Sequence, residues 1–213
     1  MNKKLRQIRV IAPAVLCVFA TTGSCSKQAD RPATTATLQP ASELEPAQIS
    51  APEDWQRGSA AGANWRIPSS WEIAPPAPMR AGTYLAAASE GDSEGAECRV
   101  NFFGAGQGGS VEGNINRWRG QMEVSGQQGA TPEPLVSEVA VNGLKVSVIE
   151  LTGTYLHKAR PMARQFTRKP GFKMFAAIVM APEGVLFFKM TGPEKTMEGE
   201  REAFRQMLGS LSV

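Results

Sequence analysis

Hydrophobic and polar residues alternate along several segments of the C-terminal three quarters of the chain, the pattern of strands with one buried face. Segment 97–103 is the clearest example, because Cys98, Val100 and Phe102 fall on one side and Glu97, Arg99, Asn101 and Phe103 on the other. We expect further strands at 64–68, 79–88, 136–156, 172–180 and 185–192.

Two segments follow a helical period instead. Ser110 can cap a helix over 110–122, in which Val111, Ile115, Trp118 and Met122 share one apolar face. Asn114 falls on the opposite side of that helix, where we expect it to be exposed. A C-terminal helix is predicted from a second apolar face, made of Met197, Phe204, Leu208 and Leu211.

Turn signals connect these elements into a fold class. Asn142-Gly143 lies between two strand-like runs and predicts a hairpin, and residues 181–184 predict a second one. The order is therefore three strands, a helix, four strands and a helix. Because hairpins dominate, we expect an α+β domain in which a mostly antiparallel sheet is covered by helices.

The N-terminus has the pattern of a secretory signal peptide over residues 1–24, with four basic residues followed by a short apolar run, Val10–Ala20. The run is too short to span a bilayer. Its end resembles a lipoprotein signal, in which Gly23 and Ser24 precede a lipidated Cys25 at the mature N-terminus. The alternative is ordinary cleavage near Gly23, which leaves Cys25 a free thiol.

Residues 25–54 predict a disordered tether, because they are rich in Ala, Pro, Thr and Ser and contain no aromatic residue. Residues 55–213 are long enough for one domain with a real core. Residues 1–24 hold four basic residues and no acidic ones, so their removal lowers the net charge from +3 to −1. That balance gives no argument for a nucleic-acid partner. Only Cys98 remains inside the domain, where we expect a buried, inert thiol.

Three short motifs resemble the PsbP-like family, named for an extrinsic subunit of photosystem II. They are W-x-x-P-x-x-W at Trp65, Pro68 and Trp71, a strand beginning at Met79, and "FFKMTGP" at 187–193. The resemblance covers about residues 60–211 and implies an α/β/α sandwich. The family also includes a small Ran-binding protein and bacterial secreted lipoproteins, and its roles are binding and assembly, so it implies no shared chemistry.

A glycine-rich stretch matches the G-x-G-x-x-G spacing at Gly104, Gly106 and Gly109. A dinucleotide site also needs a parallel βαβ unit with an acid at the end of its second strand. Here the helix leads into a Pro-rich segment and a hairpin, and Glu133 is not at a strand end. We therefore expect a flexible turn and no nucleotide cofactor.

Two further motifs suggest metal binding only weakly. Glu90, Asp92 and Glu94 have the spacing that begins a calcium loop, but Asn101 occupies the place of the bidentate glutamate. We expect a solvated turn there. His157 is the single histidine, so a His/Cys zinc site cannot be assembled. We predict a surface loop position for His157, and no catalytic, cofactor or metal site in the chain.

The segment 157–173 contains no acidic residue and six basic ones. These candidate residues for an anionic partner are Lys158, Arg160, Arg164, Arg168, Lys169 and Lys173. They can form a patch for an anionic envelope component or an acidic protein. The alternative is a solvated loop whose charges balance acids elsewhere.

The sequence therefore predicts a non-catalytic, extracytoplasmic binding or assembly module, held at the bacterial envelope by a lipid anchor. The alternative is a small-ligand carrier or an enzyme that uses a groove between helix and sheet. A pocket lined by converging polar groups favours the alternative, and a filled core with one basic face favours the module.

Overall fold

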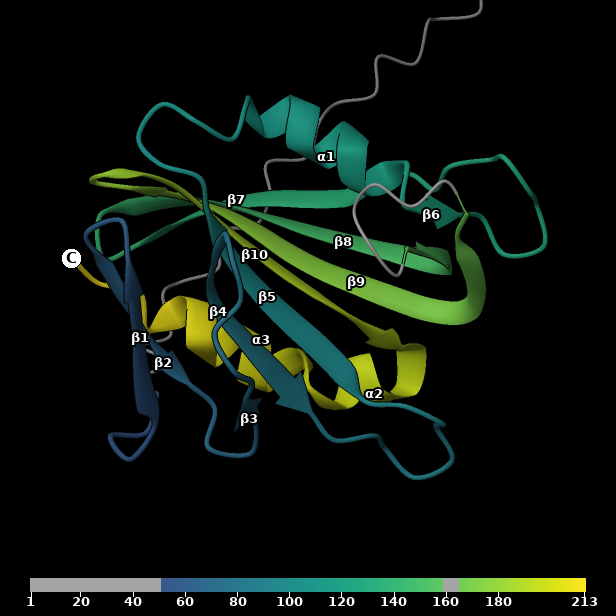
Figure 1. Ribbon diagram of the computed structural model, residues 1–213, viewed down its shortest axis with the longest axis horizontal. Coiled ribbons are helices and arrows are strands. Elements are labelled where there is room, and N and C mark those ends of the chain that lie inside the picture. The colour runs from purple at the N-terminus through teal and green to yellow at the C-terminus, as the bar shows by residue number, and fades with distance from the viewer. Residues whose placement is uncertain (1–50, 159–164) are drawn as a thin grey trace, which may run out of the picture. The chain divides into compact units, whose positions relative to one another are not determined.

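The computed structural model describes residues 51–158 and 165–213 (Figure 1). The strands are β1 (Gln56–Ala60), β2 (Ala63–Ile67), β3 (Glu72–Ile73), β4 (Arg80–Ala86), β5 (Ala96–Phe102), β6 (Met122–Glu123), β7 (Leu135–Val141), β8 (Leu144–His157), β9 (Thr167–Ala181) and β10 (Gly184–Pro193). The helices are α1 (Val111–Arg119), α2 (Glu194–Gly199) and α3 (Arg201–Gly209).

Within the described residues, the strands form one eight-stranded sheet and a separate β1–β2 hairpin, and every pairing is antiparallel. The order in the large sheet is β3-β4-β5-β10-β9-β8-β6, and β7 pairs with the first part of β8. Asn142 and Gly143 both have positive φ, as the tight turn between β7 and β8 requires. The predicted antiparallel sheet and both predicted hairpins are confirmed.

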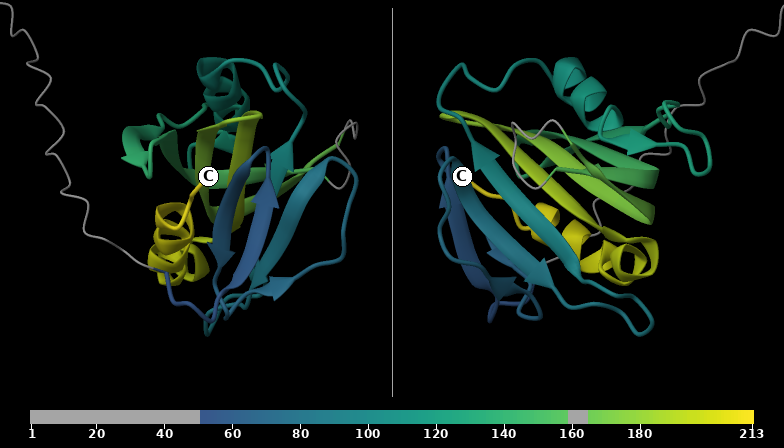
Figure 2. Two further views of the ribbon diagram at one scale, coloured as in Figure 1. Left: turned by 90° about the vertical axis from the view of Figure 1, so that its left-hand side faces the viewer. Right: turned by 45° about the vertical axis from the view of Figure 1, so that its right-hand side comes forward.

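Alternation divides the sheet into two buried faces. On one face, Trp65, Phe188 and Met207 belong to a core under α2, α3 and the β1–β2 hairpin. On the other face, Trp118 of α1 packs over Met174 and other residues of β8, β9 and β10. Figure 2 shows α1 on one side of the sheet and the C-terminal helices on the other.

The sheet dominates the fold, so the expectation that helices cover it is only partly met. A helix is about 10 Å in diameter and strands lie about 4.8 Å apart, so α1 shields only two or three strands. The part of that face formed by β4 and β5 is left open, and the polar side of β5 lies there. Within the described residues, no helix combines the length and apolarity needed to cross a membrane.

Helix α1 begins as predicted, because Ser110 Oγ accepts a hydrogen bond of 3.0 Å from the N–H of Gly113. The expectation for Asn114 is wrong, since its side chain is only 2% exposed. Its amide nitrogen donates to the carbonyl oxygens of Gly108 and Ser110, both at 2.8 Å. A polar residue is buried here because the preceding loop folds over it and offers it hydrogen-bond partners.

Most of the described residues in segment 157–173 are strand rather than loop. Strand β8 continues to His157 and β9 begins at Thr167. The pairing of these strands shifts by one residue beside Gly171, which has a φ of 67° and forms a bulge. The predicted signal peptide, Cys25 and the tether up to residue 50 lie outside the described residues, and so do Arg160 and Arg164.

Candidate functional site

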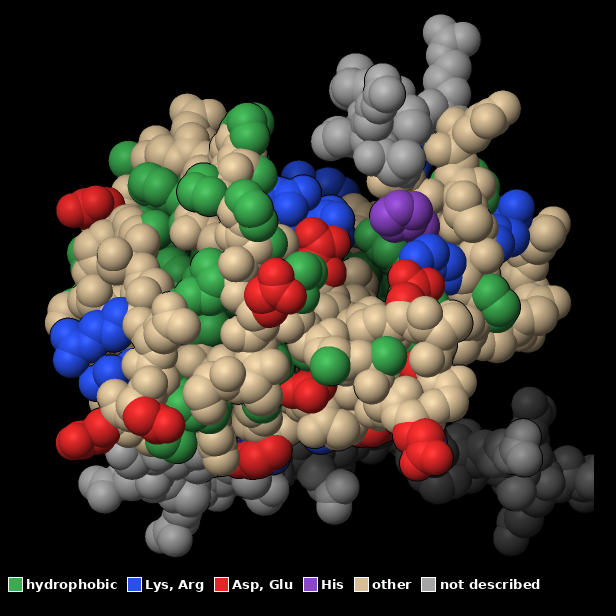
Figure 3. Space-filling model, turned by 60° about the horizontal axis from the view of Figure 1, so that its bottom comes forward, with side chains coloured by type: hydrophobic (Ala, Val, Ile, Leu, Met, Phe, Trp, Pro, Cys, Tyr) green, Lys and Arg blue, Asp and Glu red, His purple; other side chains and the backbone are tan. Residues whose placement is uncertain are grey.

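A groove of about 870 Å³ lies on the face that α1 leaves open. Its lining residues come from the segment before β4, from β4, β5 and β10, from α1 and the turn after it, and from the ends of β8 and β9. They are Pro78, Met79, Arg80, Arg99, Asn101, Phe103, Arg117, Trp118, Gly120, Gln121, Tyr155, Leu156, His157, Lys158, Phe166, Phe187 and Lys189. Figure 3 shows Lys and Arg side chains gathered near the single histidine on this side of the molecule.

The charge of the lining is one-sided. Five of the lining residues are cations, and no lining residue among those that the structure describes is acidic. The cations are Arg80, Arg99, Arg117, Lys158 and Lys189.

Strand alternation explains why these cations meet. Strand β5 sends Cys98 and Val100 into the core under α3, and therefore sends Arg99 to the opposite face. Strand β10 buries Met190 in that core and turns Lys189 to the groove. Lys189 and Arg99 are direct cross-strand partners. Like charges in such positions destabilise a sheet, so the groove concentrates positive charge at a cost.

Glu97 is the carboxylate that partly offsets this charge. Arg99 donates to both of its oxygens, with Nε–Oε1 at 2.7 Å and Nη2–Oε2 at 2.5 Å, and Arg80 Nη1 lies 3.3 Å from Oε1. Burial works to raise the pKa of Glu97. The hydrogen bond from Arg99 and the charges of Arg99, Arg80 and Lys189 outweigh it, so the pKa lies below its ordinary value. Glu97 is therefore ionised, and it balances one of the groove's positive charges.

Lys189 lies among the positive charges that Glu97 does not balance. Its Nζ donates to Gln121 Oε1 at 2.8 Å and lies 5.9 Å from the centre of the Tyr155 ring. Burial and the nearby charges of Arg99, Arg117 and Arg80 lower the pKa of Lys189 to about 8, although Glu97 acts in the opposite direction. Its surroundings thus disfavour the protonated amine. An anion bound in the groove would stabilise the protonated form.

Arg117 is held in place from within its own helix. It is exposed and donates to the side-chain oxygen of buried Asn114, one turn earlier. It also lies in the last turn of α1, where the helix dipole favours a positive charge. Asn114 therefore fixes one wall of the groove.

Three of the four described residues of the predicted basic patch are paired with acids. Arg168 Nε lies 3.0 Å from Glu123, and Lys169 Nζ lies 2.5 Å from Glu94. Lys158 is exposed at the groove. Arg160 and Arg164 lie outside the described residues, and binding by this segment stays a prediction.

Lys173 does not belong to an exposed surface and has to be removed from that patch. Its residue is only 6% exposed, because β9 turns it towards α2 and away from α1. It contacts Glu198 and lies 3.3 Å from Glu150 and 3.7 Å from Glu194. These contacts make it part of an ion-pair network between sheet and helix.

The glycine motif is a turn between β5 and α1. After α1 the chain enters β6, which pairs antiparallel with β8, so the described residues contain no βαβ unit around Gly104, Gly106 and Gly109. Gly108, with a φ of 100°, is the closest fit, since an added Cβ would lie 2.7 Å from the ring of Phe187. Gly104, Gly106 and Gly109 share a positive φ, which explains why glycine occupies these turn positions.

The acidic turn is also structural. Asp92 accepts hydrogen bonds from the N–H of Thr196 at 2.9 Å and from its hydroxyl at 2.6 Å, and so caps α2 from outside. Among residues 51–158 and 165–213, no three His, Cys, Asp or Glu side chains form a metal-binding group.

His157 and Cys98 can both be placed. His157 ends β8 and lines the groove, so the expectation of a loop position is wrong. Cys98 is fully buried, which confirms the expectation of a buried thiol, and burial raises its pKa.

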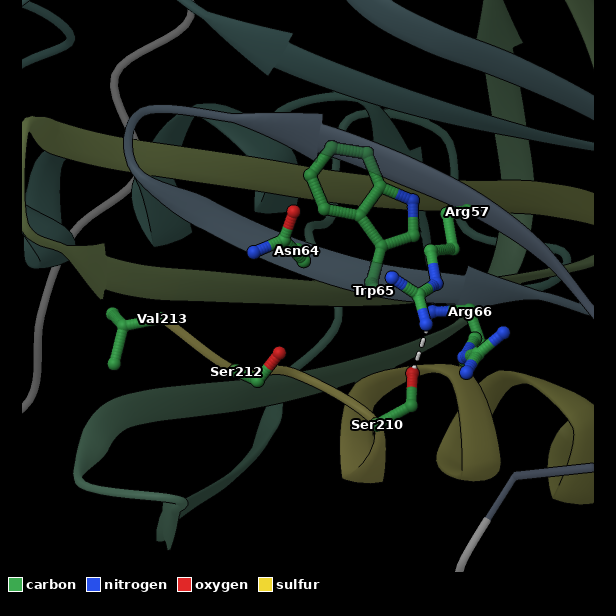
Figure 4. A pocket seen from close by; sticks show the side chains of 7 residues that line it. All are labelled: Arg57, Asn64, Trp65, Arg66, Ser210, Ser212 and Val213. Carbon is green, nitrogen blue, oxygen red and sulfur yellow. Dashed lines mark hydrogen bonds between the residues drawn. The ribbon is translucent and has the colours of Figure 1, made fainter. Parts of the chain in front are cut away.

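A smaller pocket of about 290 Å³ lies between the β1–β2 hairpin and the end of α3 (Figure 4). The polar groups of Arg66 and Ser210 in this pocket are hydrogen-bonded. The backbone N–H of Arg66 donates to Ser210 Oγ at 2.7 Å, and Arg66 Nη1 donates to the carbonyls of Glu53 and Trp55, both at 3.1 Å. The hydrogen bond between Arg66 and Ser210 joins β2 to the C-terminal segment.

Sequence reasoning did not single out four of the groove's cations, Arg80, Arg99, Arg117 and Lys189. They come from four elements and no motif joins them. The available signal was local: Lys189 interrupts the apolar run "VLFFKM", and Arg99 lies on the polar side of a strand for which a covering helix was expected.

No known protein family matches the sequence, and no curated protein matches it either. Solved structures of similar fold include the following two. The solution structure of cyanobacterial PsbP (CyanoP) from Synechocystis sp. PCC 6803 has 10% sequence identity and a TM-score of 0.47, covering 83% of this chain and 98% of that one. PA94, a protein of unknown function from Pseudomonas aeruginosa, has 11% identity and a TM-score of 0.42, covering 75% and 96%. Similarities at this level carry no functional argument.

Proposed function

We propose that this protein is a non-catalytic binding module of the bacterial envelope that holds a small anionic ligand in the groove between α1 and the sheet. The observation that carries the proposal is the lining of the groove, with five cations and no acid among its described residues. Converging polar groups in a concave site are typical of a ligand carrier and not of a purely structural module.

The chemistry of the cations supports an anionic ligand. Guanidinium groups match the geometry of carboxylates and phosphates, and Arg80, Arg99 and Arg117 supply three of them. A concave, partly dehydrated site also focuses the potential of its charges. An anion would relieve the repulsion between Arg99 and Lys189, which are direct cross-strand partners.

Binding fits the groove better than catalysis. A carboxylate acts as a general base only if it is free to accept a proton. Glu97 is instead held by two hydrogen bonds from Arg99, and its pKa lies below the ordinary value. We assign Glu97 the role of fixing the orientation of Arg99.

The proposed location rests on the N-terminal pattern, namely a signal peptide over 1–24, lipidation of Cys25 and a tether to residue 54. The proposed PsbP-like arrangement rests on the tryptophan motif. Both tryptophans are buried and hydrogen-bonded, Trp65 to Tyr84 at 3.0 Å and Trp71 to Glu200 at 2.7 Å. An anchored carrier of this kind would hold its ligand near the membrane surface.

Isothermal titration calorimetry tests the binding proposal, with the full chain carrying Cys25→Ala so that no detergent is needed. The probes are phenyl phosphate, benzoate and, as a cationic counterpart, phenethylamine. We expect the anions to bind and the amine not to bind. Arg117→Gln should weaken anion binding at least about tenfold, because one charged hydrogen bond is lost.

Arg205→Gln is the matched control. Arg205 is an exposed arginine on α3, which covers the other face of the sheet. The Arg205→Gln variant loses the same charge outside the groove, so its affinity for the anions should equal that of the parent. Absence of binding by every anion, or an equal loss in both variants, would refute the proposed function.

A further inference from the structure

Met79 lies at the groove in a conformation that methionine rarely adopts. Its φ is 61°, in the left-handed region that disfavours residues other than Gly, Asn and Asp. Met79 is also 69% exposed, the third-highest value among the large apolar residues that the structure describes as exposed. Strain and exposed apolar surface are two separate costs, and both fall on one residue of the groove's lining.

A side chain of the same lining holds Met79 in place. The amide nitrogen of Asn101 donates to the carbonyl oxygen of Met79 at 2.9 Å. Asn101 lies two residues after Arg99 on the same side of β5, so one strand face carries both a cation and the group that fixes Met79. Backbone strain that is held by surrounding contacts is a recurring feature of ligand sites.

Phe166 adds a second exposed apolar side chain to the lining. It is 38% exposed, and the guanidinium carbon of Arg168 lies 4.8 Å from the centre of its ring. The groove therefore combines cations with apolar surface at Met79 and Phe166 that is open to solvent. A ligand that is only a small inorganic ion would leave this apolar surface uncovered.

The amount of charge restricts the anion further. Arg80, Arg99, Arg117 and Lys189 are offset by one carboxylate, Glu97, so three positive charges are in excess even without Lys158. A carboxylate ligand brings one negative charge. A phosphate monoester brings about 1.5 to 2 near neutral pH and three acceptor oxygens. The phosphate balances the excess better and has more acceptors for the guanidinium donors.

We infer that the occupant of the groove is a monomeric phosphate monoester with an apolar chain, its phosphate on Arg99, Arg117 and Lys189 and its chain against Met79 and Phe166. This inference rests on the proposed function and narrows it to one class of amphiphile. The cations fix the head, and the strained Met79 supplies contact for the tail.

Calorimetric titration with three probes tests the inference, using the full chain with Cys25→Ala and concentrations below micelle formation. The probes are monododecyl phosphate, dodecanoate and inorganic phosphate. We expect monododecyl phosphate to bind at least about tenfold more tightly than each of the other two. Comparison with dodecanoate shows whether the phosphate group is needed, because dodecanoate has the same chain with a carboxylate. Comparison with inorganic phosphate shows whether the apolar chain is needed.

Met79→Asn separates binding from folding. Asn tolerates the left-handed conformation, so this variant should be at least as stable as the parent. It should nevertheless bind monododecyl phosphate about fivefold more weakly and inorganic phosphate unchanged, because only the apolar contact is lost. Ile73→Asn is the control, since Ile73 is an exposed apolar residue that does not line the groove.

Each outcome has one meaning. Tighter binding of monododecyl phosphate, with selective loss in Met79→Asn, supports the inference. Equal binding of dodecanoate overturns the phosphate assignment and leaves the proposed function intact. Equal binding of inorganic phosphate overturns the amphiphile assignment, again without affecting the proposed function. Failure of all three anions to bind refutes the inference and the proposed function together.

Discussion

Asn114→Ala removes a buried amide that joins the glycine loop, helix α1 and the groove. The side chain donates to the carbonyls of Gly108 and Ser110, both at 2.8 Å, and accepts from Arg117. After the substitution, the Ser110 carbonyl keeps its bond from the backbone N–H of residue 114, at 3.1 Å. The Gly108 carbonyl loses the side-chain donor, and Arg117 loses its acceptor.

The expected loss follows from these three bonds. A hydrogen bond contributes roughly 0.5–1.5 kcal/mol net, and more if a buried partner is left without a replacement. Because Ser110 keeps a donor, we expect the free energy of unfolding to fall by about 2–3 kcal/mol. With an m-value of about 2 kcal/mol per M of urea, the unfolding midpoint should drop by about 1–1.5 M. The released Arg117 should also weaken anion binding.

Urea denaturation followed by circular dichroism measures this change, and Asn116→Ala is the matched control. Asn116 has the same side chain on the same helix but is exposed, so its loss should change stability by less than about 0.5 kcal/mol. Equal midpoints for the two variants would refute the assigned role of Asn114. A lower m-value without a shift in midpoint would refute it as well, because it would indicate loss of two-state unfolding.

Three further predictions concern other parts of the chain. Affinity for the anion should fall as pH rises through about 8, because the pKa of Lys189 is lowered to about 8 and Lys189 attracts the anion only when it is protonated. Calorimetry between pH 7 and 9.5 should show no such fall in Lys189→Gln. The same fall in that variant would exclude Lys189 as the cause of the pH dependence. Trp118→Ala should cost about 3–5 kcal/mol by urea denaturation, since this buried ring packs edge-on against Phe187; a cost below about 1 kcal/mol would contradict the docking of α1. Intact mass should place an acylated Cys25 at the mature N-terminus, and Cys25→Ala should release the protein from membranes; a mature N-terminus elsewhere without lipid would disprove anchoring.

Local patterns in the sequence were enough to predict most of the sheet. Asn142-Gly143 requires positive φ at two positions, and few other structures satisfy that requirement, so the hairpin could be placed to the residue. The alternation at Cys98 and Val100 likewise identified the buried side of β5. These features depend on neighbours in sequence, which is why they could be predicted.

Features that depend on distant partners were missed. Arg168, Lys169 and Lys173 formed one basic run in the sequence, but each is paired with an acid from another element. Asn114 was expected at the surface, because its burial depends on the carbonyl groups of a folded loop. The cationic lining of the groove was missed for the same reason, since four elements bring its cations together.

The sheet order has a consequence for how the chain folds. Strands β7, β8, β9 and β10 follow one another in sequence as in the sheet, so their contacts close short loops. The pairing of β5 with β10 joins Cys98 to Met190, and it closes a loop of about 90 residues at a larger entropic cost. We expect the C-terminal meander to form first and β4–β5 to dock later.

The groove lies across this late junction. Arg80 and Arg99 come from the side that docks, and Lys189 comes from the strand that receives it. A collapsed intermediate with only the meander formed would lack Arg80, Arg99 and Arg117, which are three of the groove's five cations. Anion binding therefore reports the completion of folding, and an anion present during refolding should stabilise the native protein by mass action without accelerating formation of the meander.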